Sequence, residues 1–390
     1  MPSAVIVSAV RTAIATARKG ALARTTGEEL ARAILEAAVE RSRLPIEMID
    51  DVVFAESLYG GGALARHAAV EAGMTRVAGM AVNRHCAGSL TAVGIAAASI
   101  MTGMERVVVA GGVQSTSLMP QMRQRIGGGE EWTDWWIPPT HPDSADAPNA
   151  DMSITVGWNA ALSAGISREE MDAWALRSHQ RAIAAIDGGK FKNEVVSITA
   201  RGADGSAQIF DTDEHPRRDS SLEKMASLKP IHPEIEGFSI TAGNASGMND
   251  GAAALTVTST ELAKSEGLDV MARVKGWTAI GIAPRDTGIA VPRVVEKLLG
   301  RAGFRAQDVA LWEINEAFAS VPIAASRALG LDEELINISG SGCSIGHPVA
   351  ASGGRMLATL IHDLKRRGGG LGVAAMCAGG GQAGAILIEV

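Results

Sequence analysis

Aromatic side chains are scarce in this sequence. Only 4% of the 390 residues are Phe, Trp or Tyr, and there is a single Tyr. Glycine is abundant instead, with 45 residues, and hydrophobic residues make up 46% of the chain. The length predicts two or three domains, or one large fold made of repeated halves. This composition favours an α/β protein with a sizeable core and many tight turns, and it excludes a disordered or fibrous chain.

Cysteines and basic residues are also limited. The three cysteines, Cys86, Cys343 and Cys377, are odd in number and widely spaced, which makes a poor disulfide framework. No Cys or His pair has the spacing of a zinc site, so we expect no metal. Reduced thiols fit a cytoplasmic protein. The formal net charge of −7 argues against a nucleic-acid partner.

Long apolar runs are missing as well. Residues 93–101 are far shorter than the roughly 20 residues of a membrane span, so we expect no membrane partner. Residues 1–7 have the pattern of a β-strand rather than of a signal peptide.

Strand and helix patterns alternate toward both ends of the chain. We expect strands at 4–10, 51–55, 80–82 and 106–110, the last closed by Gly111-Gly112, and helices at 27–42, 66–72 and from just after Cys86 to 101. Further strands are expected at 271–280, 309–314, 371–376 and 383–390, with helices at 292–302, 317–329 and 351–366. This alternation predicts a mainly parallel sheet packed between helices.

The middle of the chain is more irregular, and rich in Pro, Gly, Asp and Trp. Its one long helical pattern, residues 168–187, begins with Ser167 as N-cap and Glu170 three residues later. We therefore predict an inserted domain at 118–247. It interrupts an N-terminal half, 1–117 plus 248–270, and is followed by a C-terminal half, 271–390.

The two halves follow one pattern. Asn83 and Asn337 each precede a turn of small residues, which is followed by a helix and then by a strand that ends in glycines. A pseudo-symmetric pair of halves would place both turns at equivalent ends of their sheets, where ligands often bind.

Cys86 lies in the first of these turns, within Asn-Arg-His-Cys-Ala-Gly-Ser-Leu. A helix start stabilises a thiolate, and the small residues after Cys86 leave room for a substrate. The alternative for a single cysteine is a buried structural role. We interpret His85 as a supporting or structural residue, since adjacent side chains usually point apart.

Two further turns carry groups that can move protons. His347 lies in Gly-Cys-Ser-Ile-Gly-His-Pro, where Pro348 restricts its backbone, and an imidazole can accept a thiol proton. Cys377 opens Cys-Ala-Gly-Gly-Gly, a loop whose N–H groups can face an oxyanion. The alternatives are a solvated turn histidine and an inert cysteine.

Two polar segments complete the set. Asn315 begins Asn-Glu-Ala-Phe and can hold a water or a carbonyl oxygen, although an ordinary N-cap is the alternative. Small residues surround Ser246 in Asn-Ala-Ser-Gly-Met-Asn-Asp-Gly, residues 244–251, which suits a narrow channel for a long polar ligand arm. A tight turn before the next strand is the alternative there.

Together these segments, in this order and over nearly the whole chain, resemble the thiolase family. The resemblance implies two similar α/β halves in alternating helix and sheet layers, with a loop domain inserted in the first. It places the nucleophile on Cys86, the histidine that activates it on His347, the acid/base cysteine on Cys377 and the water-holding amide on Asn315. One oxyanion site would use His347 and that water, and another the backbone N–H groups of Cys86 and Gly379.

The resemblance also implies the ligands. A 3-ketoacyl-CoA would be cleaved by CoA in lipid metabolism such as β-oxidation, or formed by the reverse condensation. CoA would be a substrate, and no cofactor is needed. Its pantetheine arm would lie near Ser246 and its phosphates near Arg217, although a solvated surface is the alternative for that arginine. A homodimer or homotetramer is expected.

Some positions depart from the family pattern. The sequence has Asp151-Met152-Ser153 where many members have His-Met-Gly, and Thr287-Gly288 where many have Met-Gly, so the acyl pocket is expected to differ there. The three tryptophans of residues 132–136 suggest either a wider acyl site or an oligomer contact, with domain packing as the alternative. A β-ketoacyl synthase and a non-catalytic acyl-CoA-binding protein are the competing functions. Cys377 in its glycine loop argues against the former.

Overall fold

The computed structural model describes residues 3–57, 59, 63–202 and 204–390. Its centre is a mixed sheet with the strand order β11-β12-β13-β10-β1-β9-β5-β3-β4. The strands of the N-terminal half are β1 (Ala4–Thr12), β3 (Asp51–Ala55), β4 (Ala78–Val82), β5 (Val107–Gln114) and β9 (Asn249–Ser259). The strands of the C-terminal half are β10 (Ala272–Gly281), β11 (Val309–Ile314), β12 (Leu371–Ala378) and β13 (Gln382–Glu389).

The sheet is arranged symmetrically about the pair β1–β10. These two strands are antiparallel, with Val5 opposite Arg273. In each half the last strand, β9 or β13, returns beside the first and runs antiparallel to it. The prediction of a mainly parallel sheet is therefore wrong, because these returning strands separate the parallel pairs β3–β4, β3–β5 and β11–β12. The predicted fold class, two similar α/β halves, is confirmed.

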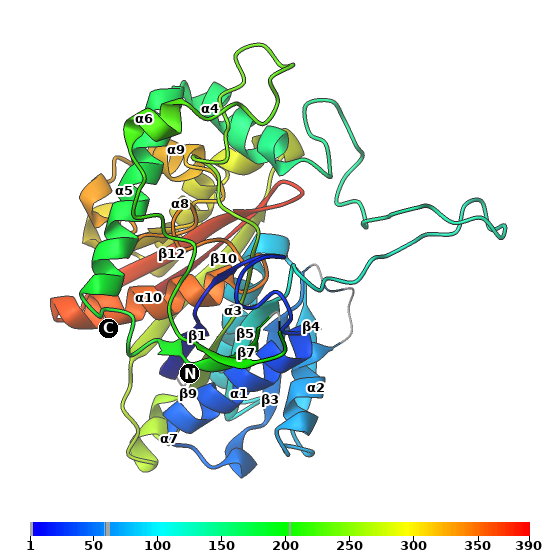
Figure 1. Cartoon of the computed structure of the whole chain (residues 1–390). Helices are drawn as coiled ribbons and strands as arrows, with labels where there is room; N and C mark the ends of the chain where they lie inside the picture. Colours follow the sequence, from blue (N-terminus) through cyan, green and yellow to red (C-terminus); the bar gives the residue numbers. More distant parts are fainter. Residues whose placement is uncertain (1–2, 58, 60–62, 203) are drawn as a thin grey trace.

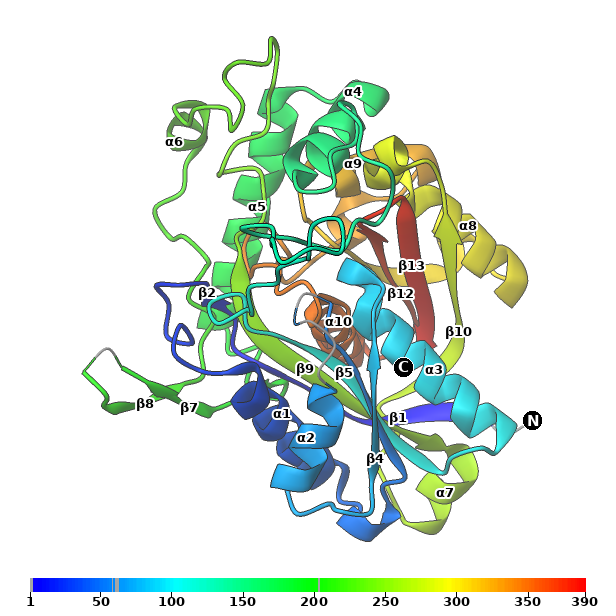
Figure 2. The ribbon, with the colours of Figure 1, turned by 90° about the vertical axis from the view of Figure 1, so that its right-hand side faces the viewer.

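Helices form three layers around the two halves of the sheet. The helices α3 (Gly88–Thr102) and α10 (Ser352–Arg367) pack against each other between the halves, as Figure 2 shows near its centre. The outer faces are covered by α1 (Gly27–Ser42) and α2 (Leu64–Glu71) on one side and by α8 (Val291–Ala302) and α9 (Ser320–Leu329) on the other. Along β1, Val5 and Val7 belong to the core under α1, and Ala4 and Ile6 to the central core. This is the alternation expected of a strand that is buried on both faces.

The segment that holds α3 is unusually apolar. Residues 85–102 have a mean hydropathy of 1.3, and by length and composition alone this helical segment could cross a membrane. The run noted in the sequence, residues 93–101, covers only part of this apolar segment and therefore underestimated its length. However, 61% of this segment is buried inside the molecule. Its packing between the two halves of the sheet is typical of a core helix.

Most predicted elements are present, with a few instructive differences. The helix α5 (Arg168–Asp187) begins as predicted, with a capping box between Ser167 and Glu170. β5 runs through Gly111 and Gly112 instead of ending there. A Cβ at Gly111 would lie 1.9 Å from a carbonyl oxygen of β9, so the glycine permits close packing within the strand.

Two other differences concern helices. α9 starts at Ser320 rather than at 317, because the backbone of Ala317 and Ala319 bonds to the segment 244–246. The inserted region also contains a π-helical turn (Ser153–Trp158) and two short helices that the sequence did not reveal, α4 (Asn159–Ala164) and α6 (Leu222–Ala226).

A long arm leaves the body of the molecule between β5 and α4 (Figure 1). Its backbone bonds run from Trp136 to Met122, from Thr133 to Gln124 and from Ile126 to Glu131, which makes an open hairpin. Several of its large apolar side chains are exposed, among them Ile126, Trp132 and Trp135. Exposed apolar side chains grouped in this way are typical of surfaces that bind a partner or a ligand.

Candidate active site

Three turns that are far apart in sequence meet between the two halves of the sheet. Cys86 lies in a 3₁₀ turn (His85–Ala87) between β4 and α3, and Cys377 lies near the end of β12. His347 lies in the loop that precedes α10. The first turns of α3 and α10 touch, since Gly354 N–H donates to Ser89 Oγ at 2.9 Å. The two central helices thereby bring the cysteine turn and the histidine turn together.

Cys86 is partly buried, and its sulfur faces the glycine loop. The backbone N–H of Gly379 lies near the Cys86 sulfur and favours its thiolate, and Cys86 in turn lies close enough to Cys377 to raise the pKa of that thiol. Burial raises the pKa of Cys86 to about 11, although the N–H groups of Gly379 and Cys86 lower it. We expected a helix start to stabilise the thiolate. Instead, desolvation dominates, so Cys86 is a thiol near neutral pH and needs a base.

Burial likewise raises the pKa of Cys377, and the neighbouring Cys86 adds to the effect. Cys377 is 2% exposed and belongs to the outer core of the C-terminal half. A protonated thiol at this place can donate a proton to a carbanion and take it back later.

The loop after Cys377 requires glycine. Gly380 and Gly381 have φ values of 81° and 71°, and a Cβ on Gly381 would lie 2.2 Å from the carbonyl oxygen of Ile282. Gly381 N–H donates to Thr287 Oγ1 at 3.0 Å, and Thr287 donates to the Pro284 carbonyl. Thr287 is therefore a fully buried support behind the glycine loop.

His347 is held from two sides. Its backbone N–H donates to Asn249 Oδ1 at 2.9 Å, and its Nδ1 lies 2.6 Å from Ser352 Oγ. Ser352 Oγ donates its only hydrogen to the Pro348 carbonyl at 3.0 Å. With its hydrogen on that carbonyl, Ser352 Oγ accepts from Nδ1, and in this arrangement the ring lone pair is on Nε2, 3.5 Å from Asn315 Nδ2.

The surroundings keep this imidazole neutral. Burial, together with the positive charge of Arg355, lowers the pKa of His347 to about 3. A neutral ring with a free Nε2 is the form that can accept a thiol proton.

Asn315 lies against His347 and is fully buried. Its Nδ2 is 3.4 and 3.5 Å from the two ring nitrogens. Its Oδ1 is buried and finds no donor among the residues that the structure describes. A buried amide oxygen without a partner costs free energy, so this atom is suited to a ligand or an ordered water.

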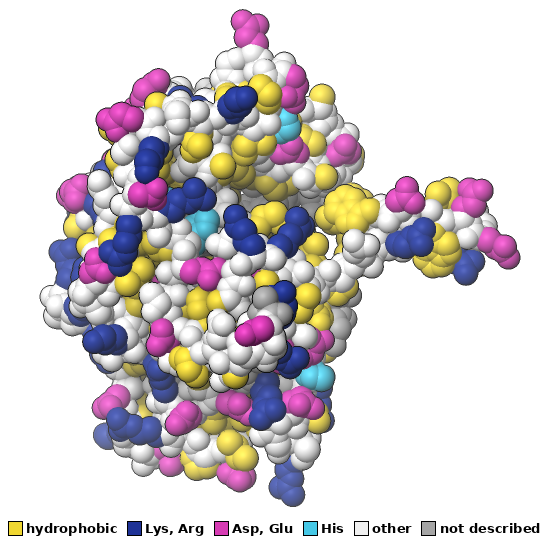
Figure 3. Space-filling model, in the orientation of Figure 1, with side chains coloured by type: hydrophobic (Ala, Val, Ile, Leu, Met, Phe, Trp, Pro, Cys, Tyr) yellow, Lys and Arg dark blue, Asp and Glu magenta, His cyan; other side chains and the backbone are white. Residues whose placement is uncertain are grey.

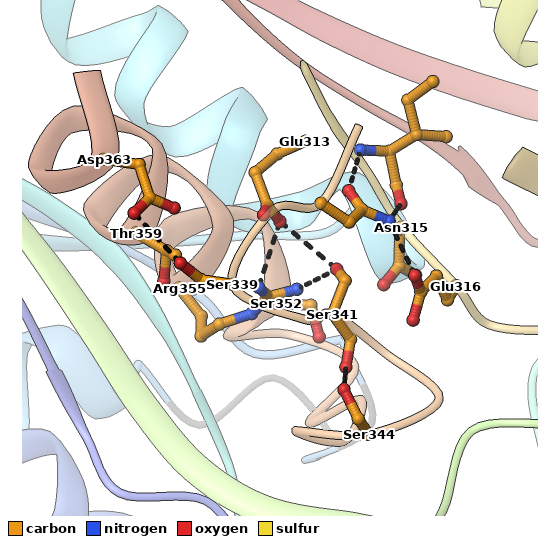
Figure 4. A network of polar contacts seen from close by, with 12 residues as sticks. Glu313, Asn315, Glu316, Ser339, Ser341, Ser344, Ser352, Arg355, Thr359 and Asp363 are labelled. Carbon is orange, nitrogen blue, oxygen red and sulfur yellow. Dashed lines mark hydrogen bonds and ion pairs between the residues drawn. The ribbon is translucent and has the colours of Figure 1, made fainter. Parts of the chain in front are cut away.

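A polar network that the sequence did not reveal supports Asn315 and the loop that holds His347 (Figure 4). Glu316 accepts from Asn337 Nδ2 at 2.8 Å and from Cys343 N–H at 3.1 Å, and so ties the Asn-Glu-Ala-Phe segment to the histidine loop. Below it, Arg355 forms a buried ion pair with Glu313 at 3.0 Å. The Glu that follows Asn315 was the only sequence signal for these contacts.

Comparison with known proteins decides the family. The family models "Thiolase, N-terminal domain" and "Thiolase, C-terminal domain" match residues 4–261 and 268–390. The chain belongs to the thiolase family. This confirms the expected enzyme class, an acyltransferase.

Relatives and solved structures agree with this. The chain is 38% identical to an acetyl-CoA acetyltransferase of Pseudomonas aeruginosa, with 98% of both chains covered. It resembles the crystal structure of the Bacillus anthracis acetyl-CoA acetyltransferase with a TM-score of 0.90, 36% identity and coverage of 100% and 99%. Human mitochondrial 3-ketoacyl-CoA thiolase gives the same TM-score at 31% identity, with coverage of 100% and 98%.

The residues expected to bind CoA lie in the segment between β5 and β9 of this thiolase-family chain. Arg217 lines a cavity of about 280 Å³ together with His179, His215 and Lys224. Lys and Arg side chains also gather around a hollow on this face of the molecule (Figure 3). From the cavity wall at Gly243, the chain runs past Ser246 to Met248, whose backbone pairs with that of His347. Ser246 therefore lies between the basic cavity and the histidine.

Asp151 and Met152, which were expected in the acyl pocket, contact other parts of the protein: Asp151 is hydrogen-bonded, and Met152 is packed against the core. Asp151 accepts from Ser153 N–H at 2.9 Å, and its other oxygen is 2.7 Å from His232 Nε2. Burial raises the pKa of Asp151, but hydrogen bonds from Ser153 and His232 outweigh this and lower it overall. Met152 packs against the outer core of the C-terminal half. Among the described residues, no group of three or more His, Cys, Asp or Glu could hold a metal ion.

Proposed function

We propose that this chain cleaves a 3-ketoacyl-CoA with CoA, through an acyl group carried on Cys86. The observation that carries the proposal is the contact of the Cys86 sulfur with Gly379 N–H, beside the thiol of Cys377. The neutral His347, with its free Nε2 on the adjoining turn, supports the same role.

The first half of the reaction opens the carbon chain. His347 Nε2 takes the proton of Cys86, and the thiolate attacks the C3 carbonyl carbon of the substrate. The N–H groups of Cys86 and Gly379 stabilise the negative charge on the C3 oxygen. The C2–C3 bond then breaks, and its electron pair stays on C2. The Cys377 thiol protonates that carbon, and acetyl-CoA leaves.

The second half releases the shortened product. The Cys377 thiolate takes the thiol proton of CoA, and the CoA thiolate attacks the acyl carbon on Cys86. Acyl-CoA leaves, and the Cys86 thiolate recovers its proton from His347. An ordered water on Asn315 Oδ1 would complete a second site for the thioester oxygen of the carbanion. The reverse sequence is a Claisen condensation.

The basic cavity supports the assignment of CoA as substrate. Arg217 and Lys224 can bind phosphate groups, and the segment 243–248 provides a path toward His347 for the pantetheine arm. Replacing Arg217 with Ala is expected to raise the KM for CoA about tenfold with little change in kcat. This is the effect of losing a contact that binds the substrate and the transition state equally well.

We further propose a cytoplasmic homodimer or homotetramer that works in fatty-acid degradation. The side chains of the edge strand β4 are half-buried or exposed, and a second copy could cover this strand and the tip of the arm at Ile126 and Trp132. All three cysteines are free, which suits a reducing compartment.

The decisive test is thiolysis of 3-ketoacyl-CoAs, followed by mass spectrometry of the protein quenched during turnover. We expect CoA-dependent cleavage and an acyl adduct on Cys86. Full activity of Cys86→Ala, or an adduct on another residue, would reject the proposal.

A further inference from the structure

A cavity of about 440 Å³ lies directly beside the nucleophile turn. One wall comes from the body of the molecule and includes Val82, Asn83 and His85. The other comes from the arm, through Met119 to Met122 and Trp135 to Thr140. The cavity lies between the root of the arm and the N-terminal half.

Two lining residues connect this cavity to the reacting atoms. The ring of His85 packs against Gly379, at 3.7 Å from the place that a Cβ there would take, and His85 directly precedes Cys86. Thr140 packs against Gly380, and a Cβ added to Gly380 would lie only 2.7 Å from the Cβ of Thr140. The cavity therefore adjoins the glycine loop that faces the Cys86 sulfur.

The size and walls of the cavity favour a large apolar group. Its volume lies within the range of roughly 300–1,000 Å³ for small-molecule sites, far more than a two-carbon acetyl group requires. Its lining includes the flat rings of Trp135 and Trp136 and the rings of Pro138 and Pro139. Trp135 remains 50% exposed, so covering it with a ligand would remove apolar surface from water.

One buried carboxyl group breaks the apolar lining. Glu56 is 4% exposed and lines the cavity. Its Oε1 accepts a long bond of 3.4 Å from Ala65 N–H, the N–H groups of Ala63 and Leu64 at the start of α2 also face the carboxyl group, and its Oε2 has no partner among the described residues. Burial raises the pKa of Glu56, which favours the protonated form that can donate to an oxygen.

We propose that this cavity holds a bulky, ring-bearing acyl group whose hydroxyl or keto oxygen bonds to Glu56. The inference rests on the proposed function, because it assigns the acyl part of the same 3-ketoacyl-CoA. The tryptophans stack on the ring, and Glu56 satisfies its unpartnered oxygen on the polar substituent.

The test compares kcat/KM for three synthetic substrates of the full chain. These are acetoacetyl-CoA, 3-ketodecanoyl-CoA and a 3-ketoacyl-CoA that ends in a 4-hydroxycyclohexyl ring. We expect the ring substrate to exceed acetoacetyl-CoA by about 100-fold and also to exceed the linear chain. Equal values for all three would overturn this inference and leave the proposed function intact. Cleavage of none of them would reject the proposed function itself.

Variants test the apolar walls of the cavity and its polar group, Glu56, independently. Trp135→Ala is expected to lower kcat/KM for the ring substrate at least tenfold and to leave acetoacetyl-CoA unchanged. Trp132→Ala is the matched control, since Trp132 lies on the same arm but stacks on Arg125, outside the cavity lining. An equal loss in both variants would overturn the inference.

Glu56 has its own control. Glu56→Met should abolish the preference for the hydroxylated ring over plain cyclohexyl, whereas Glu56→Gln, which keeps a donor, should retain it. A preference that survives Glu56→Met would overturn the assigned polar contact. In the Cys86→Ala background, quenching of tryptophan fluorescence by the ring acyl-CoA provides a binding readout that is independent of turnover. It should be lost with Trp135.

Discussion

The two central turns occupy equivalent places in the two halves and are built in opposite ways. Cys86 is partly exposed, and among the described residues the groups that favour its thiolate are its own N–H and that of Gly379. His347 is 7% exposed, with its N–H held by Asn249 and its ring by Ser352. The nucleophile must be reached by a substrate carbon, whereas the base must keep one tautomer and one orientation. One repeated scaffold thus provides access on one side and rigidity on the other.

Removing the accessible partner should have the largest effect. Cys86→Ala deletes the atom that carries the acyl group, so kcat/KM should fall by about 10⁴-fold or more. The melting temperature should fall only slightly, because the change removes a single sulfur atom at the edge of the central core. Cys343→Ala is the matched control, and steady-state thiolysis should stay within a few-fold of the wild type. Equal losses in both variants would contradict the assignment.

Removing the rigid partner should have a smaller effect, and one that depends on pH. His347→Ala should lower kcat by about 10³-fold at pH 7. Its remaining activity should rise about tenfold per pH unit toward pH 11, because the pKa of Cys86 is about 11 and thiolate then forms without a base. A pH–rate profile parallel to that of the wild type would show that His347 is not the base.

The tautomer can be tested separately from the imidazole. Ser352→Ala leaves a buried Nδ1–H without an acceptor, which costs about 1–3 kcal/mol, so kcat should fall about 10- to 100-fold. KM should remain the same. Ser352→Thr keeps the hydroxyl group and should recover most of the activity. If Ser352→Ala and Ser352→Thr are equally impaired, packing rather than the hydrogen bond is responsible.

Lowering the pH should reduce the free energy of unfolding through the buried histidines, His347 among them. Burial lowers the pKa of His347 to about 3 and those of His179, His215 and His362 to about 4. Each depressed pKa contributes stability above the unfolded value of about 6.5, and that stability is lost as pH falls toward the folded value. At pH 5 the loss is about 2 kcal/mol for each such histidine. Urea unfolding between pH 5 and 8 should show this slope, and His362→Gln should reduce it.

The contact between the two turns should have the smallest effect. Ser89→Ala leaves the buried Gly354 N–H without its acceptor and should cost about 1–2 kcal/mol of unfolding free energy. We expect kcat to change by less than about fivefold, because neither reacting group loses a direct partner. A loss of activity comparable to that of Ser352→Ala would mean that the two turns are coupled more tightly than this contact implies.

Much of this architecture could be predicted from the sequence because local patterns determine it. The helix 168–187 is marked by its own capping box, and β11 by its own apolar run. The antiparallel return of β9 and β13 could not be predicted, since strand direction depends on pairings between residues about 250 positions apart for β1–β9 and more than 100 apart for β10–β13. The same limit applies to the site. Cys86, His347 and Cys377 stood out through their small neighbours, whereas Ser352 and Glu316 became visible only through their contacts.

Desolvation is the other effect that the sequence could not show. A cysteine at a helix start suggested a low pKa, but the pKa depends on how completely the central layer excludes water. Likewise Thr287 was expected in the acyl pocket, whereas its hydroxyl group supports Gly381 from behind. Neither outcome could have been obtained from residue type and spacing alone.

The position of β1 has a consequence for how the chain is made. This strand precedes all the other described strands of its sheet in the chain, and it pairs with β9 and β10, which begin at residues 249 and 272. At about 5–20 residues per second, roughly 12 to 50 s pass before its first long neighbour is synthesised. During that time a very apolar segment has no sheet to join and is exposed to aggregation or to chaperone capture. The centre of the finished sheet is thus its most vulnerable part during synthesis.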